Sequence, residues 1–138
     1  MNFVLDCSVS MTWFFEHESA NETDALLDEL SGDSMAYVAQ HWRLEVTNVL
    51  LGAEKAKKKS AAETTQFLAL LDKLAIETDA ETERYSTTTT LSLGRKHKLT
   101  SYDAAYLELA IRRGLPLASI DRELRKAAKA ESVALIPN

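Results

Sequence analysis

The sequence predicts an α/β fold, a three-layer α/β/α sandwich with a central, mainly parallel sheet. Short, fully apolar segments alternate along the chain with longer segments of helical periodicity. Strands that are apolar along their whole length are typical of parallel sheets covered by helices on both faces. Four Gly and two Pro in 138 residues indicate short loops, and no repeat or linker interrupts the pattern. We therefore expect residues 1–138 to form a single domain.

The expected strands are short and apolar. The first ends at Asp6, and Pro116 places the beginning of the fourth, because proline is tolerated best at strand ends. Residues 75–78 contain polar positions, so we expect them at a sheet edge. The five strands are expected at residues 2–5, 35–38, 75–78, 115–119 and 133–136.

The expected helices follow from apolar residues spaced three or four apart. A first helix begins after Ser8 and carries Met11 and the aromatic residues 13–15, and a later helix follows a Ser60 cap. Thr100 or Ser101 caps another helix, which Gly114 ends. The remaining helices are expected at residues 21–31, 42–58, 81–96, 100–113 and 122–130. The inward-facing residues expected on the second and third of the long helices are Leu44, Val46, Val49, Leu50, Phe67, Leu68, Leu70, Leu71 and Leu74.

Composition excludes several classes of protein. A single cysteine, Cys7, cannot form an internal disulfide, and no zinc-binding spacing of Cys and His occurs. No apolar run approaches the roughly 20 residues that span a bilayer, and the first residues lack the basic start of a secretory signal. Phosphate-binding glycine loops are also absent, so a nucleotide cofactor is not supported. We expect a cytoplasmic protein that does not enter membranes.

The charge is unevenly distributed. The net charge is −5, and eight acidic residues precede the first basic residue, Arg43. Residues 95–129 hold nine Lys or Arg against four Asp or Glu, and a second basic group lies at residues 55–59. A basic sector in an acidic protein is compatible with phosphate binding, although two solvated helix faces are, taken alone, the better explanation.

Four acids lie where a predicted helix or strand begins or ends: Asp6, Glu45, Asp103 and Asp121. Asp6 and Asp121 follow two strands, while Glu45 and Asp103 lie in the first turns of two helices. In a parallel sheet these positions share the edge at the carboxyl ends of the strands, which is where such folds bind ligands. Asn48, three residues after Glu45, faces the same way on its helix.

Converging carboxylates repel one another unless a cation neutralises them, and hard oxygen ligands suit Mg²⁺ or Mn²⁺. Such a site supports metal-assisted cleavage of phosphodiester bonds. Taken singly, each acid has a structural explanation: Asp6 closes a strand, Glu45 is a solvated helix residue, Asp103 belongs to a capping box and Asp121 is an N-cap. Their shared edge favours the metal site.

The chain resembles PIN-domain nucleases, specifically the VapC toxins of toxin–antitoxin pairs. The resemblance covers nearly the whole chain and rests on FVLDCSVSMTWF, WRLEVTNVL, LTSYDAAYLELAIRRGLPLASIDREL and the terminal VALIP. It implies a PIN-like α/β/α sandwich in which Asp6, Glu45, Asp103 and Asp121 bind one or two Mg²⁺ or Mn²⁺ ions. Ser8 and Ser119 match auxiliary hydroxyl positions of the family. Some relatives carry a further Asp after the fourth acid, where this chain has Arg122 and Glu123.

The resemblance also implies an activity and partners. VapC toxins are metal-dependent endoribonucleases that cleave RNA, often tRNA or rRNA, and act as homodimers held by a VapB-type antitoxin. Within this scheme Asp6, Glu45 and Asp103 hold the principal ion, and Asp121 holds a second ion or orients water. Arg112, Arg113, Arg122 and Lys126 are candidate phosphate contacts.

Two other classes of function stay open. One is a phosphatase or phosphoacceptor α/β domain, which fits a strand-ending Asp6 but wants an acid where Ser8 stands. The other is a catalytically silent PIN-like module that only binds or regulates. Metal binding that depends on the four acids separates the nuclease from the silent module.

Overall fold

The fold is a five-stranded parallel sheet between two layers of helices, seen in a computed structural model that describes residues 1–18 and 20–138. The strand order is β3-β2-β1-β4-β5, and all four pairings are parallel. The strands are β1 (Phe3–Leu5), β2 (Ala36–Val38), β3 (Ile76–Thr78), β4 (Leu117–Ala118) and β5 (Leu135–Ile136). The predicted α/β/α sandwich is confirmed, with residues 76–78 at a sheet edge as expected.

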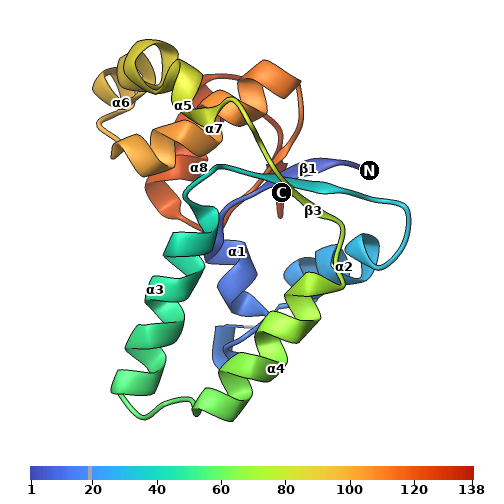
Figure 1. Cartoon of the computed structure of the whole chain (residues 1–138). Helices are drawn as coiled ribbons and strands as arrows, with labels where there is room; N and C mark the ends of the chain where they lie inside the picture. The colour runs from blue at the N-terminus through green and yellow to red at the C-terminus, as the bar shows by residue number, and fades with distance from the viewer. Residues whose placement is uncertain (19) are drawn as a thin grey trace.

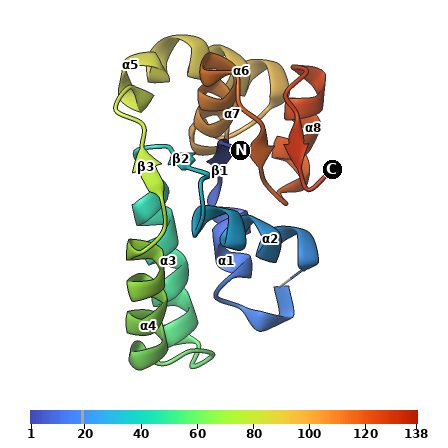
Figure 2. The same ribbon diagram turned by 90° about the vertical axis from the view of Figure 1, so that its right-hand side faces the viewer.

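Two groups of helices cover the two faces of the sheet (Figures 1 and 2). One layer holds α1 (Cys7–Thr12), α2 (Asn21–Leu30), α3 (Trp42–Lys55) and α4 (Ala61–Asp72). The other holds α5 (Thr82–Tyr85), α6 (Leu91–His97), α7 (Ser101–Arg113) and α8 (Arg122–Ala130). Two short segments, η1 (Glu16–Glu18) and the π-helical η2 (Ser86–Thr90), complete the elements. In the described part of the chain, no helix is long and apolar enough to cross a membrane.

The core lies between the sheet and the helices. All three residues of β1 are fully buried, as are Leu117 and Ala118 of β4. On α7, every residue from Ala104 to Ala110 is buried, including Glu108. Because β1 and β4 are neighbours and the chain leaves them in opposite directions, the strand order reverses between them. The fold therefore has a topological switch point at the carboxyl ends of β1 and β4.

Three predicted boundaries were wrong, each for a local reason. The first helix begins at Cys7 with Asp6, not Ser8, as its N-cap, and residues 13–15 lie beyond its end. The helix expected at 42–58 ends at Lys55, because Lys57 adopts the left-handed conformation with φ of 58°. The expected strand at 115–119 shrinks to residues 117–118, directly after Pro116.

The other departures concern helix regularity and burial. The helix expected at 81–96 is divided into α5, η2 and α6, with the threonine run inside the π-helical turn. The caps at Ser60 and Thr100 and the end at Gly114 are confirmed. Leu44 and Leu68 do not face inward, since Leu44 is 74% exposed and Leu68 41% exposed. The hairpin of α3 and α4 projects from the body of the molecule (Figures 1 and 2), which leaves one side of each helix uncovered.

Candidate metal centre

The four acids lie on four different elements at the switch point. Asp6 follows β1 and caps α1, and Asp121 follows β4 and caps α8. Glu45 is in the first turn of α3, directly after β2, and Asp103 is in the first turn of α7. Each of these helices begins at the carboxyl edge of the sheet. The structure thus places all four predicted acids at one edge, which we call the acid site.

Asp6 is the most buried member, with 4% of its surface exposed. Its carboxylate accepts a hydrogen bond from the backbone N–H of Ser8, and its backbone N–H donates to the carbonyl of Ala118 at 3.1 Å. Its own carbonyl accepts from the hydroxyl of Ser10, which in turn accepts from the indole of Trp42 on α3. These contacts fix the first acid to β4 and α3.

Two serines join the loops that follow β1 and β4. The hydroxyl of Ser119 is hydrogen-bonded to the Asp6 carboxylate and accepts from the backbone N–H of Asp121 at 3.1 Å. The hydroxyl of Ser8 accepts from the backbone N–H of Ile120 at 3.0 Å. Both serines, predicted as auxiliary residues, therefore hold Asp6 and Asp121 beside each other.

Glu45 is oriented by two aromatic side chains. The phenol of Tyr106 donates to Glu45 Oε1 at 2.5 Å, and His41 Nε2 lies 3.6 Å from the same oxygen. The His41 ring packs edge-on against Tyr106, with centroids 5.1 Å apart. Tyr106 is one turn beyond Asp103 on α7, so one helix supplies an acid of the site and the hydroxyl that holds another.

Asp103 and Asp121 differ in how their helices use them. The Asp103 backbone N–H donates to Thr100 Oγ1 at 3.2 Å, so threonine performs the capping at this helix start. At the other helix, Asp121 Oδ2 itself accepts from the backbone N–H of Leu124 at 2.9 Å. Asp121 therefore acts as an N-cap, as its structural explanation proposed, and lies in the acid site at the same time.

The acids are electrostatically coupled, and their ionised forms are disfavoured. Burial raises the pKa of Asp6 from 3.8 to about 6, against the lowering effect of Ser119 and Ser8, and the charge of Asp103 raises it further. Burial also raises the pKa of Asp103, with contributions from Asp121 and Glu45. The main influences on the two pKa values are burial, neighbouring carboxylates and, for Asp6, hydrogen bonds from Ser119 and Ser8. The site is a group of four neighbouring acids, of which Asp6 is buried and the other three are half-buried, and among the described residues no Lys or Arg forms a salt bridge with any of them.

This donor set fits a hard divalent cation by its chemistry. Among the residues that the structure describes, however, no three His, Cys, Asp or Glu side chains are arranged as a ready metal cluster. Three of the acids instead point an oxygen at a protein donor: Asp6 at Ser8, Glu45 at Tyr106 and Asp121 at Leu124. Each of these hydrogen bonds engages one carboxylate oxygen, and the second oxygen of each acid adds to the oxygen ligands that a cation would find at this edge.

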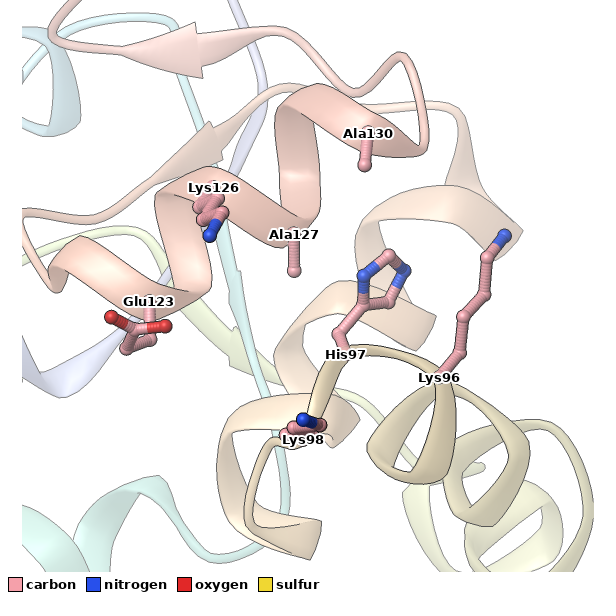
Figure 3. Close-up of a pocket in the computed structure, with 7 residues that line it drawn as sticks. All are labelled: Lys96, His97, Lys98, Glu123, Lys126, Ala127 and Ala130. Carbon is pink, nitrogen blue, oxygen red and sulfur yellow. The ribbon is translucent and has the colours of Figure 1, made fainter.

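Several other candidates lie apart from the acids. Asn48, expected to assist Glu45, is exposed on α3, and the structure records no hydrogen bond from its side chain within the described residues. Glu123 lines a different pocket of about 320 Å³ between α6 and α8, together with Lys98 and Lys126 (Figure 3). Cys7 adjoins the acids, but burial and the charges of Glu45 and Asp6 raise its pKa to about 12, which keeps the thiol protonated.

Two of the four predicted phosphate contacts are engaged elsewhere. Arg112 Nη2 lies 2.6 Å from Asp79 Oδ2, and its Nε lies 2.7 Å from Glu108 Oε2. Arg113 Nη2 lies 3.2 Å from Asp79 Oδ1, and its guanidinium stacks over the ring of Tyr37. These arginines balance buried acids, which favours a structural role for both over a phosphate contact. Arg122 and Lys126 remain exposed.

Tyr106 is the residue that sequence reasoning missed. Its position on the apolar side of α7 is typical of core packing, and it is indeed 1% exposed. Its hydroxyl nevertheless ends at Glu45, a residue 61 positions away. The available signal was the spacing Asp103-x-x-Tyr106, which places both side chains on one helix face, because a buried tyrosine hydroxyl needs a polar partner.

Comparisons with known proteins agree with this architecture. Residues 3–130 match the family described as the PIN domain. A protein from Pyrobaculum aerophilum, PAE2754, superposes with a TM-score of 0.71 at 20% identity, over 98% of this chain and 83% of the other. VapBC2 from Rickettsia felis, solved with a promoter DNA fragment, superposes with a TM-score of 0.67 at 17% identity, over 98% of this chain and 97% of the other. FitAcB from Neisseria gonorrhoeae superposes with a TM-score of 0.60 at 18% identity, over 99% of this chain and 96% of the other.

At such identities the solved structures show a shared fold. A comparison with curated protein sequences gave no significant match. The family match covers nearly the whole described chain and includes all four acids of the site. The chain therefore belongs to the PIN domain family.

Proposed function

We propose that this protein is a VapC-type toxin, a divalent-metal-dependent endoribonuclease whose whole chain acts as one PIN domain. The observation that carries the proposal is the acid site: four carboxylates at the switch point, with the pKa of Asp6 and Asp103 raised and, among the described residues, no Lys or Arg in a salt bridge with any of the four. A stable protein retains uncompensated buried charge only at a cost, and such strained groups cluster at functional sites. The silent binding module gives no reason for that cost.

In this proposal Asp6, Glu45 and Asp103 hold the principal Mg²⁺ or Mn²⁺ ion. Asp121 holds a second ion or orients the attacking water, and Ser119 keeps it beside Asp6. A bound divalent ion supplies Lewis-acid chemistry, because it lowers the pKa of water and neutralises charge on the reacting phosphate. Glu123 lies with lysines in another pocket (Figure 3), so we assign Asp121 alone to this loop.

Tyr106 is the positioning residue of the proposed centre. Its phenol keeps Glu45 on the α7 side of the site, near Asp103. Partners that hydrogen-bond a ligand carboxylate commonly account for 10–100-fold of metal affinity. Burial and the adjacent charge of Glu45 raise the pKa of Tyr106 above its ordinary value, so its hydroxyl stays a donor.

The partners of the protein follow from the same assignment. Two of the similar solved structures are described as toxin–antitoxin complexes or by a VapBC name, which supports a VapB-type antitoxin here. By analogy with the family, we expect the RNA substrate to be tRNA or rRNA. We expect the protein to act in the cytoplasm, where such RNA is found. For the homodimer, the supporting surface is a hollow of about 550 Å³ beside Glu45, where Leu44 and Tyr102 are 74% and 59% exposed.

The test of the proposed activity is cleavage of total cellular RNA by the purified protein with Mg²⁺ or Mn²⁺. Asp6→Asn is compared with Asp33→Asn, which removes an exposed acid outside the site and serves as the matched control. We expect discrete RNA fragments with wild type and Asp33→Asn, and none with Asp6→Asn or with EDTA. Cleavage that survives Asp6→Asn contradicts the assignment.

A metal titration distinguishes the proposed ribonuclease from the second candidate, a catalytically silent PIN module. Titration of Mn²⁺ followed by calorimetry should show binding that Asp6→Asn and Asp103→Asn abolish. Absence of both metal binding and cleavage in the wild type favours the silent module. Metal binding without cleavage keeps the centre and directs attention to RNA targets missing from the extract or to residual antitoxin.

A further inference from the structure

The basic residues of α8 differ from those of α7 in having no acidic partner. In the described part of the chain, Arg122, Lys126, Lys129 and Lys98 form no salt bridge, whereas Arg112 and Arg113 are paired with Asp79. All four unpaired side chains are exposed. The basic sector of the sequence thus divides into arginines that stabilise the fold and cations that are free to bind a ligand.

The free cations of α8 form one stripe. Arg122, Lys126 and Lys129 are spaced by four and three residues, which places them on one side of the helix. The opposite side, with Leu124, Ala127 and Ala128, is buried. At a rise of 1.5 Å per residue the stripe is about 10 Å long. That length corresponds to about three stacked nucleotides at 3.4 Å each.

Two pockets flank this stripe and share Lys126. One, of about 480 Å³, is lined by Ile120, Arg122, Arg125, Lys126 and Lys129. The other, of about 320 Å³, lies between α8 and the end of α6, where Lys98 stands across from Lys126 (Figure 3). Lys96 and His97 at that pocket are bound to Glu131, at 2.7 and 2.6 Å, so the remaining charged side chains that line it are Lys98, Lys126 and one acid, Glu123.

The stripe leads directly into the acid site. Asp121 is the N-cap of α8, and Arg122 is its first residue. Lys98 precedes the Thr100 cap of α7 by two residues, and Asp103 is in the first turn of that helix. The stripe therefore stands on α8, the helix that Asp121 caps, and Lys98 stands at the end of α6, just before the helix that carries Asp103. Arg125 fixes this junction, because its guanidinium donates to the carbonyl of Ser119 at 2.8 Å.

The other free basic group lies too far away for this role. Lys55, Lys57 and Lys58 are exposed at the tip of the α3–α4 hairpin. Ten helical residues separate Glu45 from Lys55, a distance of about 15 Å along α3. The α3 side of the acid site presents Leu44, Tyr102 and His41 at a hollow, and the guanidinium of Arg43 on that helix lies over the ring of Trp42.

We propose that the α8 stripe and Lys98 form a binding track for the phosphate backbone of single-stranded RNA, which enters the acid site from the α8 side. This inference rests on the proposed ribonuclease function and specifies where its substrate lies. Contacts of this kind bind phosphates irrespective of base sequence, and they weaken as salt rises. The track therefore contributes affinity and direction to RNA binding, and it leaves the choice of bases to other surfaces.

The test compares two triple variants that change the net charge equally. Arg122→Gln, Lys126→Gln and Lys129→Gln remove the stripe, and Lys55→Gln, Lys57→Gln and Lys58→Gln remove the hairpin group. Binding of a fluorescently labelled 20-nucleotide RNA is followed by anisotropy in EDTA, where cleavage is suppressed, from about 50 to 200 mM salt. Three lost phosphate contacts should reduce the slope of log K against log salt by about 2 for a single strand. We expect this reduction, and at least about ten-fold weaker binding at low salt, for the stripe variant alone.

A single-residue pair sharpens the comparison. Lys98 and Lys57 both adopt the left-handed conformation, with φ of 55° and 58°. Glycine accepts that conformation readily, so Lys98→Gly and Lys57→Gly remove one charge each with the same relief of the backbone. Lys98→Gly should lower the salt slope by about 0.7, and Lys57→Gly should leave it unchanged.

The outcomes separate this proposal from the proposed activity. Equal weakening by both triple variants means that overall charge governs binding, and it overturns the track. Unchanged binding by the stripe variant, or no measurable binding by wild type, overturns it as well. If metal-dependent cleavage persists in any of these cases, the proposed ribonuclease function stands. If wild type neither cleaves RNA nor binds metal, both the ribonuclease function and the track are overturned.

Discussion

The molecule contains two groups of buried acids that are handled in opposite ways. In what we call the arginine cluster, Asp79 and Glu108 meet Arg112 and Arg113, and Asp79 is only 1% exposed. In the acid site, the pKa of Asp6 and that of Asp103 are raised by burial and neighbouring carboxylates, and Asp6 accepts hydrogen bonds from the Ser119 hydroxyl and the Ser8 backbone N–H. Both groups lie partly on α7, so the same helix carries a compensated cluster and an uncompensated one.

The pKa shifts express this difference. Burial acts to raise the pKa of Asp79, yet hydrogen bonds and the charge of Arg112 hold it below its ordinary value. The pKa of Arg112 is raised by the same contacts with Asp79 and Glu108. At the acid site burial and like charges act together, and the pKa of Asp6 and Asp103 rises. Compensated charge contributes to stability, whereas uncompensated charge is retained for a ligand that brings the missing cation.

The largest expected difference between the acid site and the arginine cluster is in the rate of RNA cleavage. Asp103→Asn should lower metal-dependent RNA cleavage by at least about 100-fold, the loss typical when one electrostatic stabiliser is removed from an active site. Arg113→Gln, in the arginine cluster, should change kcat/KM by less than about three-fold, because its guanidinium serves Asp79 and Tyr37. Rates are measured on the RNA that the wild type cleaves. A large loss with Arg113→Gln restores the arginine as a substrate contact.

The arginine cluster should carry the larger effect on folding. Asp79→Asn leaves the guanidinium groups of Arg112 and Arg113 with an uncharged partner, and removing one member of a buried ion pair costs about 3–5 kcal/mol. Urea unfolding without metal should show a lower midpoint at an unchanged slope. Asp103→Asn in the same assay should lose no stability, because it removes repulsion. Equal destabilisation by both variants means that the acid site is also a structural cluster.

The pH dependence of stability should differ between wild type and Asp6→Asn. The folded-state pKa of Asp6, about 6, lies above its ordinary value of 3.8, so the folded protein binds the extra proton between these values. Protonation of Asp6 therefore adds to the free energy of unfolding. The added stability is fully present below pH 3.8 and is lost as the pH rises through 6, a change of about 2–3 kcal/mol. Asp6→Asn should lack this downward slope in EDTA.

Added metal provides the control for that measurement. Mg²⁺ or Mn²⁺ at pH 7 should restore the stability of wild type, because binding to the folded state alone shifts the unfolding equilibrium. Asp6→Asn should show little response. An identical pH slope in both proteins would remove Asp6 as the source of the repulsion.

Local patterns in the sequence predicted the elements of the fold well. Apolar runs gave the positions of all five strands, and the Ser60 and Thr100 caps and the Gly114 end were readable from single residue types. The errors occurred where two residues compete for one local role. Asp6 and Ser8 are both good capping residues, and in the structure the Asp6 carboxylate accepts from the Ser8 N–H. No periodicity distinguishes a regular helix from the π-helical turn at residues 86–90.

The candidate site was predictable in part for the same reason. The four acids share an edge because β-α order dictates where strands end and helices begin. The roles of Arg112 and Tyr106 depend instead on partners 33 and 61 residues away. The sequence does not reveal which residues of a basic cluster form salt bridges with acids in the folded protein. The basic residues of α7 and α8 are therefore indistinguishable in the sequence and differ only in their partners in the structure.

The smallest expected effect tests whether Glu45 belongs fully to the uncompensated site. Tyr106→Phe keeps the packing of a side chain that is 1% exposed and removes only the hydroxyl that donates to Glu45 at 2.5 Å. Loss of such a partner should weaken Mn²⁺ binding about ten-fold by calorimetry and lower cleavage at subsaturating metal. Cleavage should recover at high Mn²⁺, because the acids themselves are intact. The matched change Tyr102→Phe alters an exposed tyrosine on the same helix and should leave metal affinity unchanged. If Tyr106→Phe instead tightens metal binding, its hydroxyl competes with the ion for Glu45, and Glu45 resembles the compensated acids more than the open site.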